Sequence, residues 1–427
     1  MRKTLEQVRG YDRSVQLLLA NQFTINLGFY MLMPYLAQHL SGTLGLAGWA
    51  VGLVLGVRNF SQQGMFLIGG TLADRFGYKP LIVAGCLLRT AGFATLGLVD
   101  SVAALLAASA ATGFAGALFN PAVRAYLAAD AGERRVEAFA LFNIFYQAGI
   151  LLGPLVGMLL TGIDFRLTCL VSAAVFGLLS IVQIRALPTR RGQPASSAGV
   201  IGQWRTVLAN RAFLLFAAAM TGAYVLSFQV YLALPLEVRR IGGAGEAGTV
   251  AVALLFAASG LATILGQTRI TTWCKQHLTP GQALVRGLLF MGGAFVPLVV
   301  ASALPVPAAG GVGRWSLAAL PPLLAALLLA VGTMIAYPFE MDTVVRLADD
   351  RLVATHYGLY NTVCGIGITI GNLLTGVSLD AARAAGMSAL PWLALLGLGL
   401  GSAAALHGLH RTGRLTRPQP VEGLRQP

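Results

Sequence analysis

Carboxylates are the side chains of this sequence with the clearest capacity for chemistry. All sixteen Asp and Glu residues fall in loops, at termini or close to the ends of apolar segments. Asp74, Glu340 and Asp342 lie nearest to the path between the expected helices, where a carboxyl group can bind a proton or pair with an arginine. We expect Arg124 to pair with Glu340 or Asp342 as a gate that protonation loosens. The alternative is that these charges only mark where helices meet water.

Other chemistry finds little support in the sequence. The five histidines have no metal-ligand partners nearby, and the four cysteines show no paired spacing for a disulfide or a metal. No phosphate-cradling loop is present, which argues against ATP as the energy source. We therefore expect a protein that is not an enzyme and that uses neither a cofactor nor a metal.

The elements that must position these residues are membrane helices. The chain is 56% hydrophobic and only 11% charged, with a mean hydropathy of +0.73, whereas soluble domains carry about 25% charged residues. Twelve apolar segments recur, each long enough to cross about 30 Å of hydrocarbon. The expected spans are 15–38, 47–71, 80–99, 101–126, 138–162, 166–187, 212–235, 248–271, 282–304, 316–342, 357–380 and 389–410.

The net charge of +14 is distributed as a membrane topology requires. With a cytoplasmic N-terminus, 21 of the 30 Lys and Arg residues fall in cytoplasmic segments, and five fall in external loops. The first apolar run is too long for a cleavable signal and lacks a cleavage site. We expect a multi-pass protein of the bacterial inner membrane, in contact with lipid, with both termini cytoplasmic and no nucleic-acid partner.

A short charged loop links the second and third spans. Gly70 allows close helix packing, Gly77 makes the turn, and Pro80 suits the first position of the next helix. Asp74, Arg75 and Lys79 supply charge where the chain leaves the bilayer. The run from Gly70 to Pro80 resembles the Gly-x-Leu-Ala-Asp-Arg-x-Gly-x-Lys loop of the major facilitator superfamily. That resemblance implies an all-α transporter fold with two six-helix halves related by a pseudo-twofold axis.

An internal repeat agrees with two halves. Leu141-Phe142-Asn143, Gly149 and Gly153 recur 218 residues later as Leu359-Tyr360-Asn361, Gly367 and Gly371. Such an offset, near half the chain, is what a parallel repeat leaves. The polar stretch between the halves reads as a linker. We divide the chain into an N-terminal half at 1–187, a cytoplasmic linker at 188–211, a C-terminal half at 212–410 and a basic tail at 411–427.

The fifth span carries a second motif. Gly149, Gly153, Pro154 and Gly157 place glycines four apart on one helix face, with a proline that bends the helix. The pattern resembles the Gly-x-x-x-Gly-Pro-x-x-Gly signature of proton-coupled exporters in the superfamily, although a tightly packed helix pair would need the same residues. Two positions depart from that pattern: Ser109 and Asn21 stand where many of these exporters carry an Arg and an Asp.

Two arginines lie near the middle of spans, where a charge costs about 2.5–3.5 kcal/mol on insertion scales. Arg58 either joins a structural network or faces the cavity and attracts an acidic group of a substrate, and Arg89 suits a structural role. The other expected cavity residues are apolar, aromatic or amide-bearing, as suits amphipathic ligands, although such side chains also pack helices. The full set is Asn26, Tyr30, Arg58, Gln62, Asn143, Gln147, Tyr224, Phe228, Gln229, Tyr231 and Asn361.

The sequence as a whole resembles the drug:proton antiporters of the superfamily. This resemblance implies secondary active efflux of amphipathic small molecules, fluoroquinolone-like compounds among them, by alternating access and in exchange for protons. One alternative is a dedicated exporter of one acidic metabolite or siderophore. Another is a receptor or scaffold that does not transport, although the short loops leave little surface for a partner. We expect a monomer.

Overall fold

Long helices make up nearly all of the described chain. The computed structural model describes residues 2–189, 199–242, 246–303 and 312–415, and within these ranges it contains helices and no strands. In hydrocarbon each backbone group needs an internal partner, and a helix provides one within a single segment. The apolar segments of the sequence therefore fold as helices, and the expected fold class of an all-α membrane protein is confirmed.

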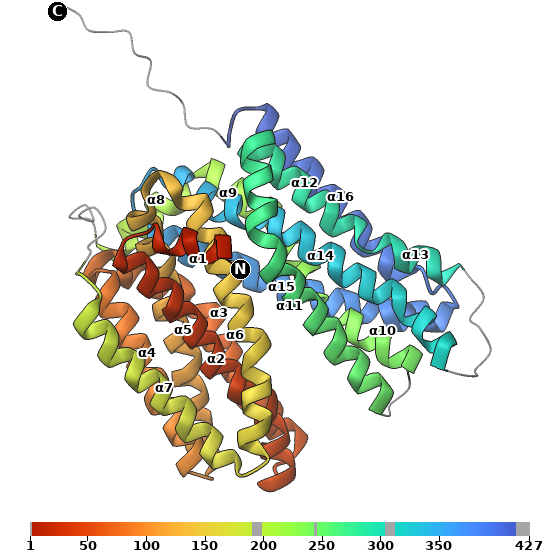
Figure 1. Ribbon diagram of the computed structural model, residues 1–427, viewed down its shortest axis with the longest axis horizontal. Helices are drawn as coiled ribbons and strands as arrows, with labels where there is room; N and C mark the ends of the chain where they lie inside the picture. Colours follow the sequence, from red (N-terminus) through yellow and green to blue (C-terminus); the bar gives the residue numbers. More distant parts are fainter. Residues whose placement is uncertain (1, 190–198, 243–245, 304–311, 416–427) are drawn as a thin grey trace, which may run out of the picture.

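Six long helices form the N-terminal half, drawn in red to yellow in Figure 1. Their bounds are α2 (Arg13–Gln38), α3 (Gly48–Phe76), α4 (Tyr78–Leu98), α5 (Val102–Ala131), α6 (Arg135–Thr161) and α7 (Phe165–Ala186). Short turns η1 (His39–Thr43) and η2 (Gly132–Arg134) follow α2 and α5. Helix α3 packs on α5, α2 packs on α6, and α4 packs on both α5 and α7.

The C-terminal half repeats this arrangement, in green to blue in Figure 1. It comprises α9 (Arg211–Phe228) with α10 (Ala233–Gly242), α11 (Glu246–His277), α12 (Pro280–Gly293) with α13 (Val296–Ser302), α14 (Val312–Leu347), α15 (Val353–Ala385) and α16 (Leu390–Arg411). Helix α11 packs on α14, α9 on α15, and α12 on both α14 and α16. Each pair has its counterpart in the first half, as a pseudo-twofold repeat requires.

The number of spans is compatible with twelve. Within the described ranges, nine stretches are long and apolar enough to cross a membrane, and one of them, Val102–Thr161, contains both α5 and α6. Helices α2 and α3 are also long enough but are not among the nine. Both carry several polar side chains, such as Asn21 and Gln22 in α2 and Arg58 and Gln62 in α3. The count of twelve and the domain boundaries remain predictions.

Several helices end later than the sequence suggested. Helix α3 continues to Phe76 instead of ending near residue 71, and α14 continues to Leu347 instead of 342. Asp74 therefore lies inside a helix and not in a loop, and Glu340 and Asp342, expected at the end of their span, are followed by another turn of helix. The expected linker contains a helix of its own, α8 (Val200–Ala209), and its residues 190–198 lie outside the described ranges. Of the expected tail, only residues 411–415 are described.

The halves approach each other at one end of the molecule. Figure 1 shows the two bundles close together near α8 and the short helix α1 (Arg2–Arg9), and diverging toward the opposite end. Between the halves, α3 packs along α15 and α6 packs along α11. The loop from Gly70 to Pro80 lies at this same end, which we call the loop end.

Candidate functional site

Asp74 joins the two halves at the loop end. Its Oδ1 accepts a hydrogen bond from the backbone N–H of Ala354 at 3.1 Å. Its Oδ2 accepts from the backbone N–H and from the hydroxyl of Thr355, both at 2.7 Å. These are the second and third residues of α15, whose N-cap Leu352 provides no side-chain hydrogen bond. A carboxylate is a favourable partner for the free N–H groups of a helix N-terminus, so Asp74 caps a helix of the opposite half.

Glycines bring α3 and α15 into backbone contact beside Asp74. A Cβ on Gly70 would overlap the carbonyl of Ala354, and one on Gly358 would overlap the carbonyl of Phe66. Further along, the hydroxyl of Thr362 donates to the carbonyl of Gln63 at 3.2 Å. These contacts run antiparallel from the loop end toward the middle of α3. We call them, together with the Asp74 cap, the α3–α15 latch.

The rest of the motif loop supports the turn. Gly77 has φ of +94°, a conformation that L side chains rarely adopt. Lys79 donates to the carbonyl of Ile184 at 2.8 Å, which fixes the start of α4 against the end of α7. Arg75 is exposed, with its guanidinium 6.0 Å from the ring of Phe76. Of the three charged motif residues, Asp74 is the one that contacts the other half.

A second latch joins α6 to α11. Lys275 Nζ lies 2.6 Å from Glu137 Oε1, and deeper along the same pair Asn143 donates to Gln267 Oε1 at 2.7 Å. Partial burial raises the pKa of Glu137, but hydrogen bonds from Lys275 and Arg134 lower it more, so the net pKa is below its ordinary value. The α6–α11 latch thus combines a partly exposed ion pair with a buried amide pair.

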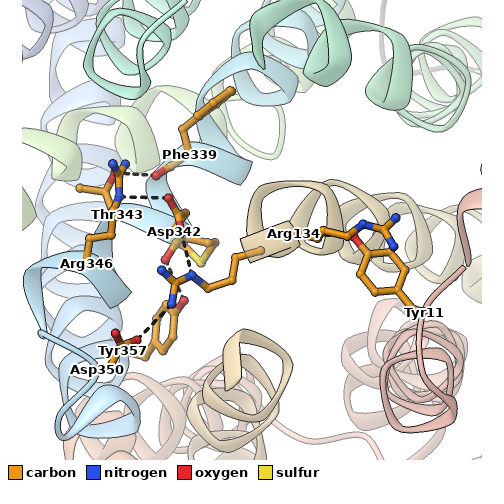
Figure 2. A network of polar contacts seen from close by, with 10 residues as sticks. Tyr11, Arg134, Phe339, Asp342, Thr343, Arg346, Asp350 and Tyr357 are labelled. Carbon is orange, nitrogen blue, oxygen red and sulfur yellow. Dashed lines mark hydrogen bonds and ion pairs between the residues drawn. The ribbon is translucent and has the colours of Figure 1, made fainter. Parts of the chain in front are cut away.

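Asp342 and its partners form a third contact between the halves. Arg135 at the start of α6 pairs with Asp342 and with Asp350, each at 3.0 Å, and Arg346 pairs with Asp342 at 3.0 Å. Figure 2 shows Asp342, Arg346 and Asp350 in this cluster. Arg135 was not singled out from the sequence, because nothing in an Arg-Arg pair at a helix start distinguishes it from other loop cations.

The expected pairing of Arg124 with Glu340 or Asp342 is not among the contacts between described residues in this conformation, and the gate stays a prediction. Arg124 donates to Asn361 Oδ1 at 2.8 Å, and Arg135 takes the place that we expected for Arg124 beside Asp342. Glu340 is 4% exposed, and its Oε1 accepts from the hydroxyl of Tyr360 at 2.7 Å. Because Tyr360 and Asn361 are adjacent on α15, Glu340 and Arg124 are linked through that helix and not by a direct ion pair.

The glycines of the second motif pack α6 on α2. A Cβ on Gly149 would lie 2.6 Å from the carbonyl oxygen of Phe23, and one on Gly157 would overlap the carbonyl of Met31. Gly153 packs in the same way against Tyr30. The carbonyl of Pro154 accepts a hydrogen bond from the hydroxyl of Tyr35 at 2.6 Å. The repeat places Gly367 and Gly371 equivalently, against α9.

The two mid-span arginines have different surroundings. Arg89 is 3% exposed, donates to the carbonyl of Thr112 at 3.0 Å, and has the rings of Phe29, Phe119 and Phe176 within 5.4 Å of its guanidinium carbon. Such cation–π contacts offset part of the cost of burying the charge. Arg58 has the Phe29 ring at 5.1 Å and donates to Asn59, but it forms no ion pair within the described ranges. It therefore keeps donor capacity for a ligand.

The remaining wall candidates divide into packed and accessible groups. Asn26 donates to the carbonyl of Gln22 in its own helix, and Gln229 is fully buried and donates to Val225 in its own half, so both serve helix packing. Tyr30, Gln62, Gln147, Tyr224 and Phe228 are half-buried. Tyr231 is 46% exposed, with its ring 5.6 Å from Phe228 and 5.5 Å from Phe256 of α11. The accessible side chains are mainly aromatic.

Two residues that join the halves were not identified from the sequence, Gln267 and Thr355. Gln267 binds Asn143 across the interface and also donates to the carbonyl of Met334 at 2.9 Å. An amide isolated in an apolar span is a signal that could have identified it. Thr355 offered no such signal, since a threonine at a helix start ordinarily serves its own helix. Among the described residues, no group of three or more His, Cys, Asp or Glu side chains is placed to hold a metal.

Comparison with known proteins identifies the family. The family model described as Major Facilitator Superfamily matches residues 18–372. This chain belongs to the major facilitator superfamily. The superfamily is one of transporters, so the expectation of a transporter and not an enzyme is confirmed. An uncharacterized MFS-type transporter of Mycobacterium tuberculosis is 51% identical over 420 residues, which cover 96% of this chain and 98% of the relative.

More distant relatives of this superfamily member carry functional names. Multidrug resistance protein MdtH of Shigella dysenteriae is 31% identical over 378 residues, covering 88% of this chain and 89% of the relative. A crystal structure of a POT family transporter in complex with 5-aminolevulinic acid aligns with a TM-score of 0.69 over 96% of this chain and 98% of that one. At 13% identity that likeness concerns the fold alone. The protein is a multi-pass membrane transporter of small molecules.

Proposed function

We propose that this transporter exports amphipathic small molecules from the bacterial cytoplasm by alternating access, in exchange for protons. The main support is the distribution of contacts between the halves. The Asp74 cap and the Arg135–Asp342 pair join the halves at the loop end through groups that water can replace, which suits an end that opens and closes. By the positive-inside rule this end faces the cytoplasm of an inner membrane, so the described state is closed to the inside.

The amphipathic substrate class is supported by the walls and by the relatives. The accessible candidates Tyr30, Phe228 and Tyr231 offer apolar surface with hydroxyl groups, which suits drug-sized organic molecules better than sugars. The relatives named multidrug resistance protein MdtH point the same way. The Mycobacterium relative is uncharacterized and carries no information on substrate.

Glu340 is the proposed proton carrier. It is buried on α14 and accepts a hydrogen bond from the hydroxyl of Tyr360 on α15. Arg124 of the other half contacts the same helix α15. Protonation would remove the charge that Tyr360 stabilises and change the contacts of α15, which belongs to a latch. Asp342 is less suited, because it already forms ion pairs with Arg135 and Arg346.

Uptake into inverted membrane vesicles tests both parts of the proposal. We expect a fluorescent amphipathic dye and a fluoroquinolone to accumulate on energisation, and a protonophore to abolish that uptake. Glu340→Gln should lower gradient-driven uptake at least tenfold while substrate exchange without a gradient persists. Asp380→Asn, an exposed carboxylate whose ion pair within the described ranges is with Arg383 of its own helix, is the matched control. Equal proton-driven uptake by Glu340→Gln and wild type would exclude Glu340 as the carrier.

Arg58 supports a second candidate, export of one acidic metabolite or siderophore. Its guanidinium has no carboxylate partner within the described ranges, and an acidic group of a substrate would supply one. Folded wild-type protein that fails to accumulate either test compound but accumulates an organic acid would favour this candidate. Membership of a transporter superfamily leaves the receptor alternative without support.

A further inference from the structure

A cavity of about 630 Å³ lies on the side of the C-terminal half, between α12 and α16. Its walls come from one stripe of each helix. Gln282, Val285, Arg286 and Leu289 recur at three- and four-residue spacing on α12, and Leu400, Ala403, Ala404, His407 and Arg411 do so on α16. The described residues that line the cavity all belong to the C-terminal half.

Close contacts between the two helices flank the cavity. At one end, Gly292 meets Gly399 at backbone distance, and at the other, the ring of His410 covers Gly281. Between these points α16 presents the small side chains Ala403 and Ala404. They do not fill the space opposite α12, so a hollow remains that is apolar at its deep end.

The shallow end of the cavity is basic. His407, His410 and Arg411 line it, Arg286 follows half-way between Gly281 and Gly292 on α12, and neither α12 nor α16 contains an Asp or Glu. None of these four side chains forms a hydrogen bond or an ion pair with another described residue. Four basic side chains with no acidic partner among the described residues predict an anionic occupant.

The axial arrangement matches one lipid molecule. From Leu400 to Arg411 is eleven residues along α16, which at about 1.5 Å per residue separates the apolar and basic ends by roughly 16 Å. The basic end is the loop end, which the proposed topology places at the cytoplasmic surface. Here phosphate groups lie next to the ends of helices and acyl chains lie beside their middles.

We propose that this cavity binds one anionic phospholipid of the cytoplasmic leaflet. Arg286, Arg411 and the two histidines hold the phosphate, and the first acyl carbons lie on Leu289 and Leu400. The related helix pair of the other half, α4 and α7, is closed differently, since Lys79 donates to the carbonyl of Ile184 there. Arg185, exposed at the same end of α7, provides a matched control cation outside the cavity.

Native mass spectrometry of the purified full-length protein tests the proposal, by titration with phosphatidylglycerol or with phosphatidylcholine of the same acyl chains. We expect the first phosphatidylglycerol to bind at least tenfold more tightly than the first phosphatidylcholine. Arg286→Gln and Arg411→Gln should each weaken phosphatidylglycerol about fivefold, equivalent to about 1 kcal/mol per basic residue near an anionic lipid. Arg185→Gln should leave its affinity unchanged.

A second variant separates a lipid from a free anion. Ala404→Phe fills the apolar end without altering charge, and it should weaken phosphatidylglycerol as strongly as one arginine substitution. Inorganic phosphate alone should neither bind measurably nor displace the lipid. The proposal is overturned by equal affinities for the two lipids, by unchanged phosphatidylglycerol binding in both Arg286→Gln and Arg411→Gln, or by phosphate displacing the lipid from a protein whose lipid binding Ala404→Phe does not change. None of these outcomes depends on transport activity.

Discussion

Asp74→Asn should weaken the α3–α15 latch by an amount that can be worked from its hydrogen bonds. Both carboxylate oxygens accept from N–H groups of α15, so an amide keeps one acceptor and turns its NH₂ toward a backbone N–H. A buried N–H without an acceptor costs about 1–3 kcal/mol, and losing a negative charge at a helix N-terminus costs about 0.3–1 kcal/mol. Water can hydrogen-bond to the unpaired N–H only after the latch has opened, so these costs fall on the closed state.

The two costs add to about 1.3–4 kcal/mol against the closed state, or about 10- to 1,000-fold in the ratio of open to closed molecules. Spin labels at Ala186→Cys and Gln276→Cys, exposed positions on the two halves at the loop end, report this ratio as a distribution of distances. Since the native cysteines Cys86, Cys169, Cys274 and Cys364 are all buried, they should not compete for the label.

Two further variants test the assignment of Asp74 as a cap of α15. Thr355→Val removes the hydroxyl donor and should shift the ratio in the same direction, and its effect should not add to that of Asp74→Asn, because both act on one cap. Asp12→Asn changes an exposed carboxylate at the same end and should have no effect. A ratio in Asp74→Asn within twofold of wild type, from folded protein, would refute the assignment of Asp74 as a cap between the halves.

Three other outcomes are expected. Arg58→Gln should lower transport of acidic compounds about tenfold and spare neutral ones, as measured by vesicle uptake; equal loss for both classes would assign Arg58 a structural role. Gly157→Ala should lower the thermal stability of the purified protein, by about 1–3 kcal/mol for overpacking, whereas Gly56→Ala meets open space and should not; equal stability of the two would contradict the close approach of α6 and α2. The lowered pKa of Glu137 means that its ion pair with Lys275 stabilises the closed state at pH values above the ordinary carboxyl pKa and is lost only as the pH falls through the lowered one. A variant with cysteines cross-linked at the two positions, and with the rest of the latch intact, gives the reference distance for the closed site. A wild-type distance across that site that changes between pH 6 and 8 would contradict the pairing.

The fold was largely predictable because its signals are local. An apolar segment of membrane-spanning length can be recognised from neighbouring residues alone. The repeat that relates Asn143 to Asn361 can be recognised from one constant offset in the sequence. Helix ends were less predictable. Asp74 and Glu340 looked like residues at the mouths of spans, yet α3 and α14 continue beyond them, since nothing in their charge alone ends a helix that packs against other protein.

The pairing of side chains between the halves could not be read from the sequence. The repeat placed Arg124 opposite Glu340 and Asp342. It could not show that Arg135 forms the ion pair with Asp342, or that Arg124 donates a hydrogen bond to Asn361. Likewise, the motif identified Asp74 as important without naming its partners on α15. Such choices depend on the register of helices that lie far apart in sequence and on which of two nearby cations is closer.

The two latches differ in their sensitivity to salt. The Glu137 and Lys275 side chains are 30% and 36% exposed, so dissolved ions screen their attraction, whereas Asp74 is 7% exposed and bonds to backbone groups. Raising the ionic strength should therefore loosen the contact of α6 with α11 and leave that of α3 with α15 nearly unchanged. The two halves would then separate unevenly, turning about the α3–α15 contact as a hinge. The ionic strength of the solution at the loop end would thus influence which side of the closed end opens first.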